Sequence, residues 1–213
     1  MNNRIKYSRA ELAAMTKTRL VNTMSELFKK HPLEEIKITD ICKEAGVSVG
    51  TFYHYYRSKA DYFHEVMQED DTAALKEWEH YKNMYKNPAD AIRFLTVASI
   101  RDVTENGPVY ATSLYRFMLY PDYESSAMND PQRVMEMRKT ILDRDKGYRG
   151  IIKGQMELLA EQGRLCGEVS AVFESLMDIM TGTIYNWCYR DGEYDIVDRL
   201  NRLLDAFLSY YTR

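Results

Sequence analysis

Hydroxyl, aromatic and basic side chains gather between residues 39 and 59, the part of the chain with the clearest chemical potential. A short helix is expected from residue 49, and its outward positions hold Val49, Gly50, Thr51, Tyr53, His54 and Tyr55. In a DNA major groove, hydroxyl groups bond phosphates, rings and methyl groups pack on thymine methyls, and Gly50 allows close backbone approach. A helix that met only solvent would rarely expose so many tyrosines. The segment therefore predicts a DNA-reading helix.

Local signals make this helix the second of a helix-turn-helix. Gly46 follows a short segment for which Thr39 is the expected N-cap, and Ser48 is the expected N-cap of the next helix. Helix N-termini at Thr39, Ser48 and Ser58 can present N–H groups to phosphates. A longer helix precedes them, opened by a capping box at Ser8. The apolar residues that a small three-helix core needs are Ile38, Ile41, Ala45, Val47, Phe52 and Tyr56.

The charge of the chain is split between its two ends. The net charge of −3 leans against nucleic acid if it is taken as a whole. Residues 1–60, however, hold 11 Lys and Arg against 6 Asp and Glu, a net of +5, which leaves −8 for residues 61–213. This asymmetry indicates a basic end that meets nucleic acid or a membrane surface, with a chance fluctuation of surface charge as the alternative.

The run from residue 38 to residue 59 resembles the DNA-binding domain of TetR-family transcriptional regulators. The resemblance implies that the helix at residue 49 is the recognition helix and that Lys59 grips a phosphate. The family's DNA-contact pattern falls on Thr39, Ser48, Thr51, Tyr53, His54 and Lys59. Two residues depart from the pattern, because Tyr56 stands where phenylalanine is usual and Cys42 where alanine is common.

The remaining sequence predicts a larger helical body. Further helices are expected over residues 59–85, from 89 or 90, and over 109–120, 132–162, 170–189 and 195–211, with a break at Asn106-Gly107-Pro108 and a loop over 122–131. The fold class is thus all-α with about nine helices. We expect a helix-turn-helix DNA-binding domain over residues 1–58 and an effector-binding and dimerisation domain over residues 59–213.

An aromatic-rich stretch between residues 78 and 123 is the best candidate for a small-molecule pocket. It holds nine aromatic residues, about a fifth of its length. The side chains expected to line an effector site are Tyr81, Phe94, Tyr115 and Met118, with Gln155 as a polar partner. The resemblance also implies an effector pocket among these helices. A tyrosine-rich structural core is the alternative.

The last two helices carry broad apolar faces that predict a twofold four-helix interface. The residues expected at a homodimer interface are Phe173, Leu176, Met180, Ile184, Leu200, Leu204 and Phe207. The alternative is that these faces only complete the core of a single chain.

Together these features predict a sequence-specific DNA-binding transcriptional regulator. The resemblance implies a repressor, because repression is the commoner mode of action in the family. A hydrophobic or aromatic small-molecule effector would release the repressor from a palindromic operator. The alternative is a DNA-binding protein of the same fold without a small-molecule switch, controlled by a partner or architectural. The sequence has no G-x-S-x-G motif, no Walker loop and no dinucleotide glycine fingerprint, so we expect neither an enzyme nor a cofactor.

Metal, membrane and disulfide chemistry are not indicated. Three widely spaced cysteines, Cys42, Cys166 and Cys188, form no C-x-x-C pair, and the histidines lack neighbours that would complete a ligand set. No apolar run approaches the roughly 20 residues that span a bilayer. The N-terminal residues lack the apolar core of a signal peptide, and we expect a cytoplasmic protein.

Overall fold

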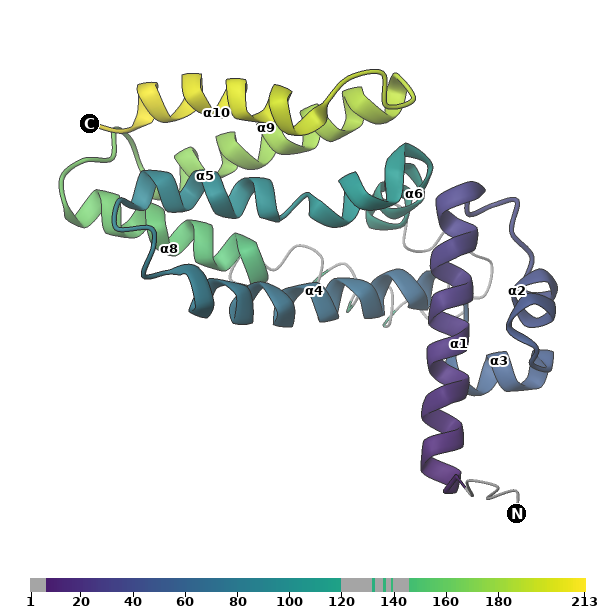
Figure 1. The fold of residues 1–213 in the computed structure, drawn as a ribbon. Coiled ribbons are helices and arrows are strands. Elements are labelled where there is room, and N and C mark those ends of the chain that lie inside the picture. Colours follow the sequence, from purple (N-terminus) through teal and green to yellow (C-terminus); the bar gives the residue numbers. More distant parts are fainter. Residues whose placement is uncertain (1–6, 120–131, 133–135, 137–138, 140–145) are drawn as a thin grey trace, which may run out of the picture.

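The computed structural model describes residues 7–119, 132, 136, 139 and 146–213 and is all-α in architecture over these residues (Figure 1). The N-terminal helices are α1 (Arg9–Lys30), α2 (Ile38–Ala45) and α3 (Val49–Tyr55). The body contains α4 (Ala60–Tyr81), α5 (Pro88–Ala98), α6 (Arg101–Leu119), α8 (Gly147–Glu161), α9 (Val169–Tyr189) and α10 (Ile196–Tyr211). The body helices run alongside one another, while α1 crosses their end and carries α2 and α3 on its outer side. The predicted fold class is confirmed.

Helix α1 begins at the capping box that the sequence predicts. The Ser8 N–H donates to Glu11 Oε2 at 2.7 Å, and the Glu11 N–H donates to Ser8 Oγ at 3.2 Å. Leu20, Met24 and Phe28 are fully buried along one face of this helix. The Phe28 ring stacks on Phe63 of α4 with centroids 4.9 Å apart, so α1 is packed onto the start of the body.

The helix-turn-helix closes as expected, although one cap differs. Gly46 ends α2 at a φ of 64°, a left-handed conformation that glycine adopts without strain, and Ser48 Oγ accepts from the Thr51 N–H at 3.0 Å. The N-cap of α2 is Lys37 and not Thr39, because the Lys37 carbonyl already accepts the Asp40 N–H at 3.0 Å. Thr39 therefore lies in the first turn, where its side chain is exposed.

The predicted start of α4 also needs a correction. Ser58 is buried and is not the N-cap, which is Lys59. The Asp61 carboxylate instead accepts the Arg57 N–H at 2.6 Å and the Ser58 hydroxyl at 3.3 Å. A carboxylate in the first helical turn thus replaces the expected hydroxyl cap.

Several body boundaries differ from the sequence expectation. Helix α4 ends at Tyr81 rather than near residue 85, and α5 begins at Pro88, with Asn87 Oδ1 accepting the Ala89 N–H at 3.2 Å. The expected break at residues 106–108 is a kink within α6, where Gly107 has a φ of 86°. Within the range 132–162, where one helix was expected, the structure has α8 from Gly147 to Glu161. The loop expected over 122–131 and most of residues 132–145 lie outside the described residues.

Helix α6, like α4, contacts the N-terminal part of the chain. The Leu33 N–H donates to Ser113 Oγ at 3.1 Å, and Arg116 forms an ion pair with Glu34.

In the ranges for which helices are described, none is long and apolar enough to cross a membrane.

Candidate DNA interface and effector grooves

Helix α3 presents the outward face that a groove-reading helix needs. Val49 and Tyr53 are 41% and 53% exposed, and Gly50 and His54 are exposed beside them. The opposite side of the helix buries Phe52, whose ring meets the edge of Tyr53 at 5.6 Å between centroids. This contact fixes the direction in which the exposed tyrosine leaves the helix.

Tyr55 differs from its neighbours on α3. Its hydroxyl donates to the Ala13 carbonyl of α1 at 3.1 Å, and its side chain is half-buried. The expectation that it faces outward is therefore corrected. Tyr55 attaches α3 to α1 and so sets how far α3 projects.

Ser48 and Thr51 form a small polar unit at the start of α3. Their hydroxyl oxygens lie 2.8 Å apart, and either atom can be the donor. Ser48 is exposed, whereas Thr51 is half-buried. Both hydroxyls already serve the helix cap, so any contact with DNA would be shared with that role.

Lys59 has a structural role that the sequence does not reveal. Its Nζ donates to the Leu33 carbonyl at 2.5 Å and to the Ile36 carbonyl at 2.7 Å. These carbonyls belong to the connection between α1 and α2. No side chain caps the start of α2. A phosphate contact at Lys59 would therefore be shared with this structural role.

The departure at Tyr56 is explained by its surroundings. The ring is 2% exposed in the core of the DNA-binding head, which consists of α1, α2 and α3. The hydroxyl donates to Glu65 Oε2 at 3.0 Å. Burial raises the pKa of Tyr56, and the Glu65 charge raises it further. The Glu65 carboxylate also meets Lys17 Nζ at 2.7 Å, so the extra hydroxyl ties α3 to α4 and α1.

The described residues expected at the effector site lie in different surroundings. Tyr81 meets the edge of Phe94 at 5.5 Å between centroids, while Tyr115 lies inside the bundle, where burial raises its pKa to about 12. Phe94 and Gln155 line two different grooves. Met118 lies on α6, and its side chain is outside the described residues.

The first groove lies between α4 and α8 and has a volume of about 600 Å³. Its apolar walls include Leu75, Trp78, Ile151 and Leu158, and Gln155 and Lys146 contribute polar groups. The helix face along its floor is bare, because it holds Gly147, Gly150 and Gly154. The apolar walls were not predicted to form a site; the spacing of the three glycines is the signal that points to this groove.

The second groove, of about 490 Å³, lies over α5, α6 and the start of α10. Phe94 and Val97 form its apolar base. At its rim, Arg93 Nη2 lies 2.5 Å from Asp205 Oδ1 of α10. This ion pair uses the charge of Arg93 within the chain.

Most residues expected at a dimer interface are buried within the chain itself. The side chains that are at most 5% exposed are Phe173, Leu176, Ile184, Leu200, Leu204 and Phe207, and Met180 is half-buried. They pack α9 and α10 onto the body, so the intrachain core describes them better than a partner contact does. The exposed positions of the same two helices carry Tyr185, Tyr189, Leu203 and Tyr210 at 68%, 78%, 37% and 73%.

Thr181 and Gly182 of α9 also face outward. A Cβ added at Gly182 would meet no atom within 4 Å, and Thr181 is exposed beside it.

Within the described part of the chain, no three His, Cys, Asp or Glu residues are placed to hold a metal ion.

The arrangement defines a class of protein: a helix-turn-helix head whose reading helix is exposed, mounted on a helical body with an apolar groove. Residues 20–66 match the family model described as bacterial regulatory proteins of the tetR family. The match covers the last part of α1, the helices α2 and α3, and the start of α4.

Two curated relatives extend the comparison. The transcriptional regulator UidR of Escherichia coli K12 is 28% identical over 83 residues, a match that spans only 39% of each protein's length. The fatty acid metabolism regulator protein of Bacillus subtilis is 21% identical over 195 residues, which cover 89% of this chain and 92% of that protein.

Solved structures share the fold across nearly the whole chain. FadR from Bacillus subtilis, solved with stearoyl-CoA, has a TM-score of 0.64 at 17% identity and matches over 91% of this chain and 98% of its own. Thermus thermophilus FadR, a TetR-family repressor solved with lauroyl-CoA, has a TM-score of 0.59 at 22% identity, with 90% and 93% covered. At these identities the likeness concerns the fold.

Proposed function

We propose that the chain acts as a cytoplasmic homodimer that binds palindromic operator DNA and that an apolar acyl effector releases it. The observation that carries the proposal is the exposed face of α3 in a head that matches the family model. We take residues 1–58 as the DNA-binding unit and residues 59–213 as the effector-binding and dimerisation unit. Repression is proposed as the mode of action.

The proposed DNA contacts fall into two groups. Val49, Gly50, Tyr53 and His54 form the exposed reading face, on which methyl and ring surfaces suit base edges. Thr39, Ser48, Thr51 and Lys59 border this face and suit phosphate oxygens. The net charge of +5 over residues 1–60 supports salt-dependent attraction to the duplex.

A dimer is proposed because one short helix reads too few base pairs. Two recognition helices about 34–36 Å apart would read both halves of a palindrome on one side of the duplex. The proposed contact surface consists of Tyr185 and Tyr189 of α9 and Leu203 and Tyr210 of α10. Gly182 leaves open space on α9, which permits close approach of a second copy.

The proposed effector is a fatty acyl-CoA held in the α4–α8 groove. The apolar walls suit an acyl chain, and the bare glycine face allows a chain to lie against the backbone of α8. Lys146, at the N-terminus of α8, offers positive charge to an anionic end of the ligand. The acyl-CoA complexes of the two FadR structures support the same ligand class.

The test begins with operator sequences selected from random DNA by the purified protein. Fluorescence anisotropy then measures operator affinity without ligand and with saturating stearoyl-CoA or lauroyl-CoA. A palindromic consensus and a loss of affinity of roughly tenfold or more would support the proposal. If acyl-CoA binds the protein but operator affinity is unchanged, the alternative of a DNA-binding protein without this switch is favoured.

A further inference from the structure

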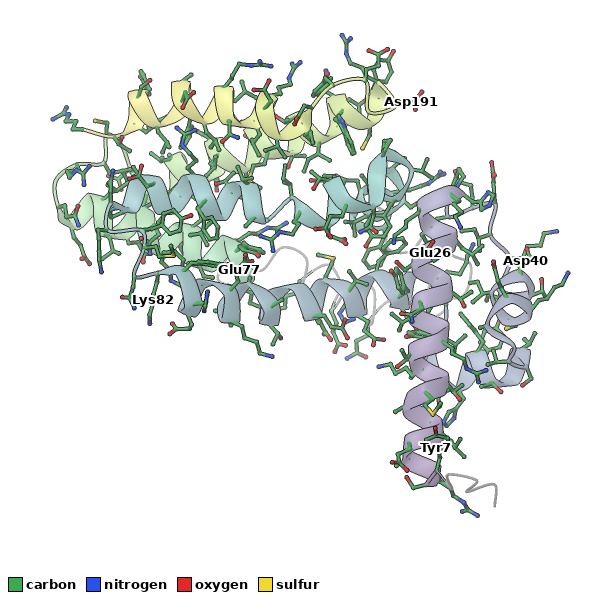
Figure 2. The ribbon with its side chains drawn as sticks, in the orientation of Figure 1. Tyr7, Glu26, Asp40, Glu77, Lys82 and Asp191 are labelled. Atoms are coloured by element: carbon green, nitrogen blue, oxygen red, sulfur yellow. The ribbon has the colours of Figure 1, made fainter. Side chains whose placement is uncertain are left out.

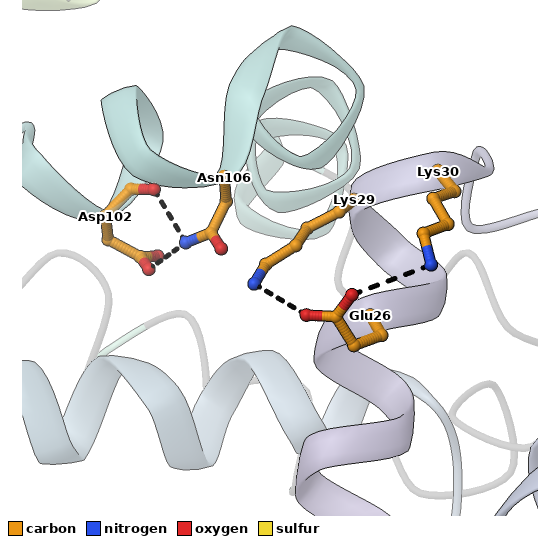
Figure 3. A network of polar contacts seen from close by, with 5 residues as sticks. All are labelled: Glu26, Lys29, Lys30, Asp102 and Asn106. Atoms are coloured by element: carbon orange, nitrogen blue, oxygen red, sulfur yellow. Dashed lines mark hydrogen bonds and ion pairs between the residues drawn. The ribbon is translucent and has the colours of Figure 1, made fainter.

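The joint between α1 and α6 contains a half-buried carboxylate, Asp102, with one buried and unsatisfied oxygen (Figure 3). Asp102 lies in the first turn of α6, and its Oδ1 accepts from Asn106 Nδ2 at 2.5 Å. Its Oδ2 has no hydrogen-bond partner among the residues that the structure describes. Buried polar atoms nearly always have a partner, so this oxygen calls for an explanation.

The surroundings of Asp102 combine burial with several polar groups. Burial is the main cause that raises the pKa of Asp102, and the Glu105 charge raises it further. Tyr110, the charge of Lys29 and the amide of Asn106 act in the opposite direction and lower the pKa. Lys29 belongs to α1, and it is the cation from the head that acts on this carboxylate.

Lys29 is held by another carboxylate in this structure. Its Nζ lies 3.0 Å from Oε1 of Glu26 on the same helix, and Lys30 Nζ lies 3.6 Å from Oε2 of that glutamate. The Glu26 side chain is 58% exposed, whereas the Lys29 side chain is 32% exposed. Figure 3 shows the Lys29 ammonium on the side of α1 that faces Asp102, with Lys30 directed away from it.

The two possible partners of Lys29 differ in a way that permits exchange. An ion pair with exposed Glu26 is weak, because water and salt screen it. A pair with the buried Oδ2 of Asp102 would be less screened and therefore stronger, but it requires α1 to lie closer to the first turn of α6. A shift of α1 along this joint would change which pair is preferred.

We propose that Asp102 is a positioning residue that accepts Lys29 in a second arrangement of the joint, so that exchange of Lys29 between Glu26 and Asp102 sets the angle of the DNA-binding head. The proposal rests on the proposed function for its role in regulation. Its physical basis is the unsatisfied Oδ2 and the cation that faces it across the joint.

A chain of packed aromatic rings in the same joint would transmit such a change. Tyr62 of α4 packs on Phe28 of α1, with ring centroids 5.1 Å apart, and burial raises the pKa of Tyr62 to about 12. Phe63, the next residue of α4, packs on Tyr110 of α6 with ring centroids 5.8 Å apart. The chain connects α1, α4 and α6, so a movement of α1 against α6 is felt by the helix that leads into the body.

The first test compares Lys29→Met with its matched control, Lys30→Met, in the full-length protein without DNA or ligand. Each substitution removes one partner of Glu26, but only Lys29 acts on Asp102. Carbon-13 NMR of the aspartate carboxyls, assigned with Asp102→Asn, should show the pKa of Asp102 rising by roughly 0.5 in Lys29→Met and staying unchanged in Lys30→Met. Equal effects of the two variants would overturn the proposal.

The second test measures the joint directly. Spin labels on exposed Thr18 of α1 and exposed Glu157 of α8 report the head-to-body distance by pulsed electron paramagnetic resonance. Asp102→Asn and Lys29→Met should both narrow the distance distribution to a single population, whereas Lys30→Met should retain the wild-type distribution. An unchanged distribution in all three variants rules out the exchange. Because neither test uses operator or effector, failure of the proposed function would show separately, as a loss of DNA binding by the wild-type protein.

Discussion

Arg101 holds the carboxylate of Glu77 with both terminal nitrogens, at 2.8 Å and 3.3 Å, and so ties the start of α6 to the far part of α4. Tyr148 of α8 donates to the same glutamate. Figure 2 marks Glu77 on α4, remote from Tyr7 near the start of α1. Because α4 and α6 both reach the N-terminal helices, this contact couples the groove region to the helices that carry α3.

Loss of the Glu77 charge should loosen this end of the body. The hydrogen bond from Arg101 is the main cause that lowers the pKa of Glu77 in the folded protein. A lowered folded-state pKa contributes stability that is present above the unfolded pKa and is lost as pH falls through the folded value. Glu77→Gln should therefore lower the Tm by about 2–5 °C at pH 7, and the difference from wild type should shrink on acidification below pH 4. A difference that stays constant with pH would contradict this assignment.

Tyr53 and Lys59 should separate DNA contact from head stability. Tyr53→Ala removes an exposed ring and should weaken operator binding by about tenfold or more with an unchanged Tm. Lys59→Ala should weaken binding and also lower the Tm, because the carbonyls of Leu33 and Ile36 lose their donor. Anisotropy and thermal unfolding measure the two effects. An unchanged operator affinity in both variants would remove these residues from the interface.

The exposed face of α9 and α10 should carry the dimer. Leu203→Glu places a charge on the proposed contact surface and should weaken dimerisation by about 100-fold, as measured by light scattering over a dilution series. Met84→Glu is the matched control, because Met84 is exposed at 73% in the connection between α4 and α5. A Leu203→Glu protein that dimerises as the control does would place the interface elsewhere.

The glycine face of α8 should tolerate a large side chain but lose its ligand. A Cβ at Gly154 would meet no atom within 4 Å, so Gly154→Phe should fold with a wild-type Tm while filling the groove. We expect its affinity for stearoyl-CoA to fall by roughly tenfold or more in calorimetry. Ala160→Phe, at an exposed position of the same helix, is the control. Equal binding by both variants would move the effector out of this groove.

The helix-turn-helix was predictable because its signals are local. The capping box at Ser8, the left-handed residue Gly46 and the cap at Ser48 each act within a few residues of the chain. The apolar residues Ile41 and Ala45 of α2 recur at helical spacing and are buried as expected. Even here, the N-cap of α2 was misplaced by two residues, since a backbone carbonyl can start a helix without help from a side chain.

The body shows what the sequence by itself did not determine. Leu176 of α9 and Leu204 of α10 each belong to a set of apolar residues at helical spacing, which marks a buried face. That spacing is the same whether the face meets its own chain or a partner. Only the packing of α9 and α10 onto the body decided that these side chains are internal and that Tyr185 and Leu203 remain outside. The second role of Lys59 and the unsatisfied oxygen of Asp102 likewise depend on segments distant in sequence, because tertiary contacts determine where a charged group finds its partners.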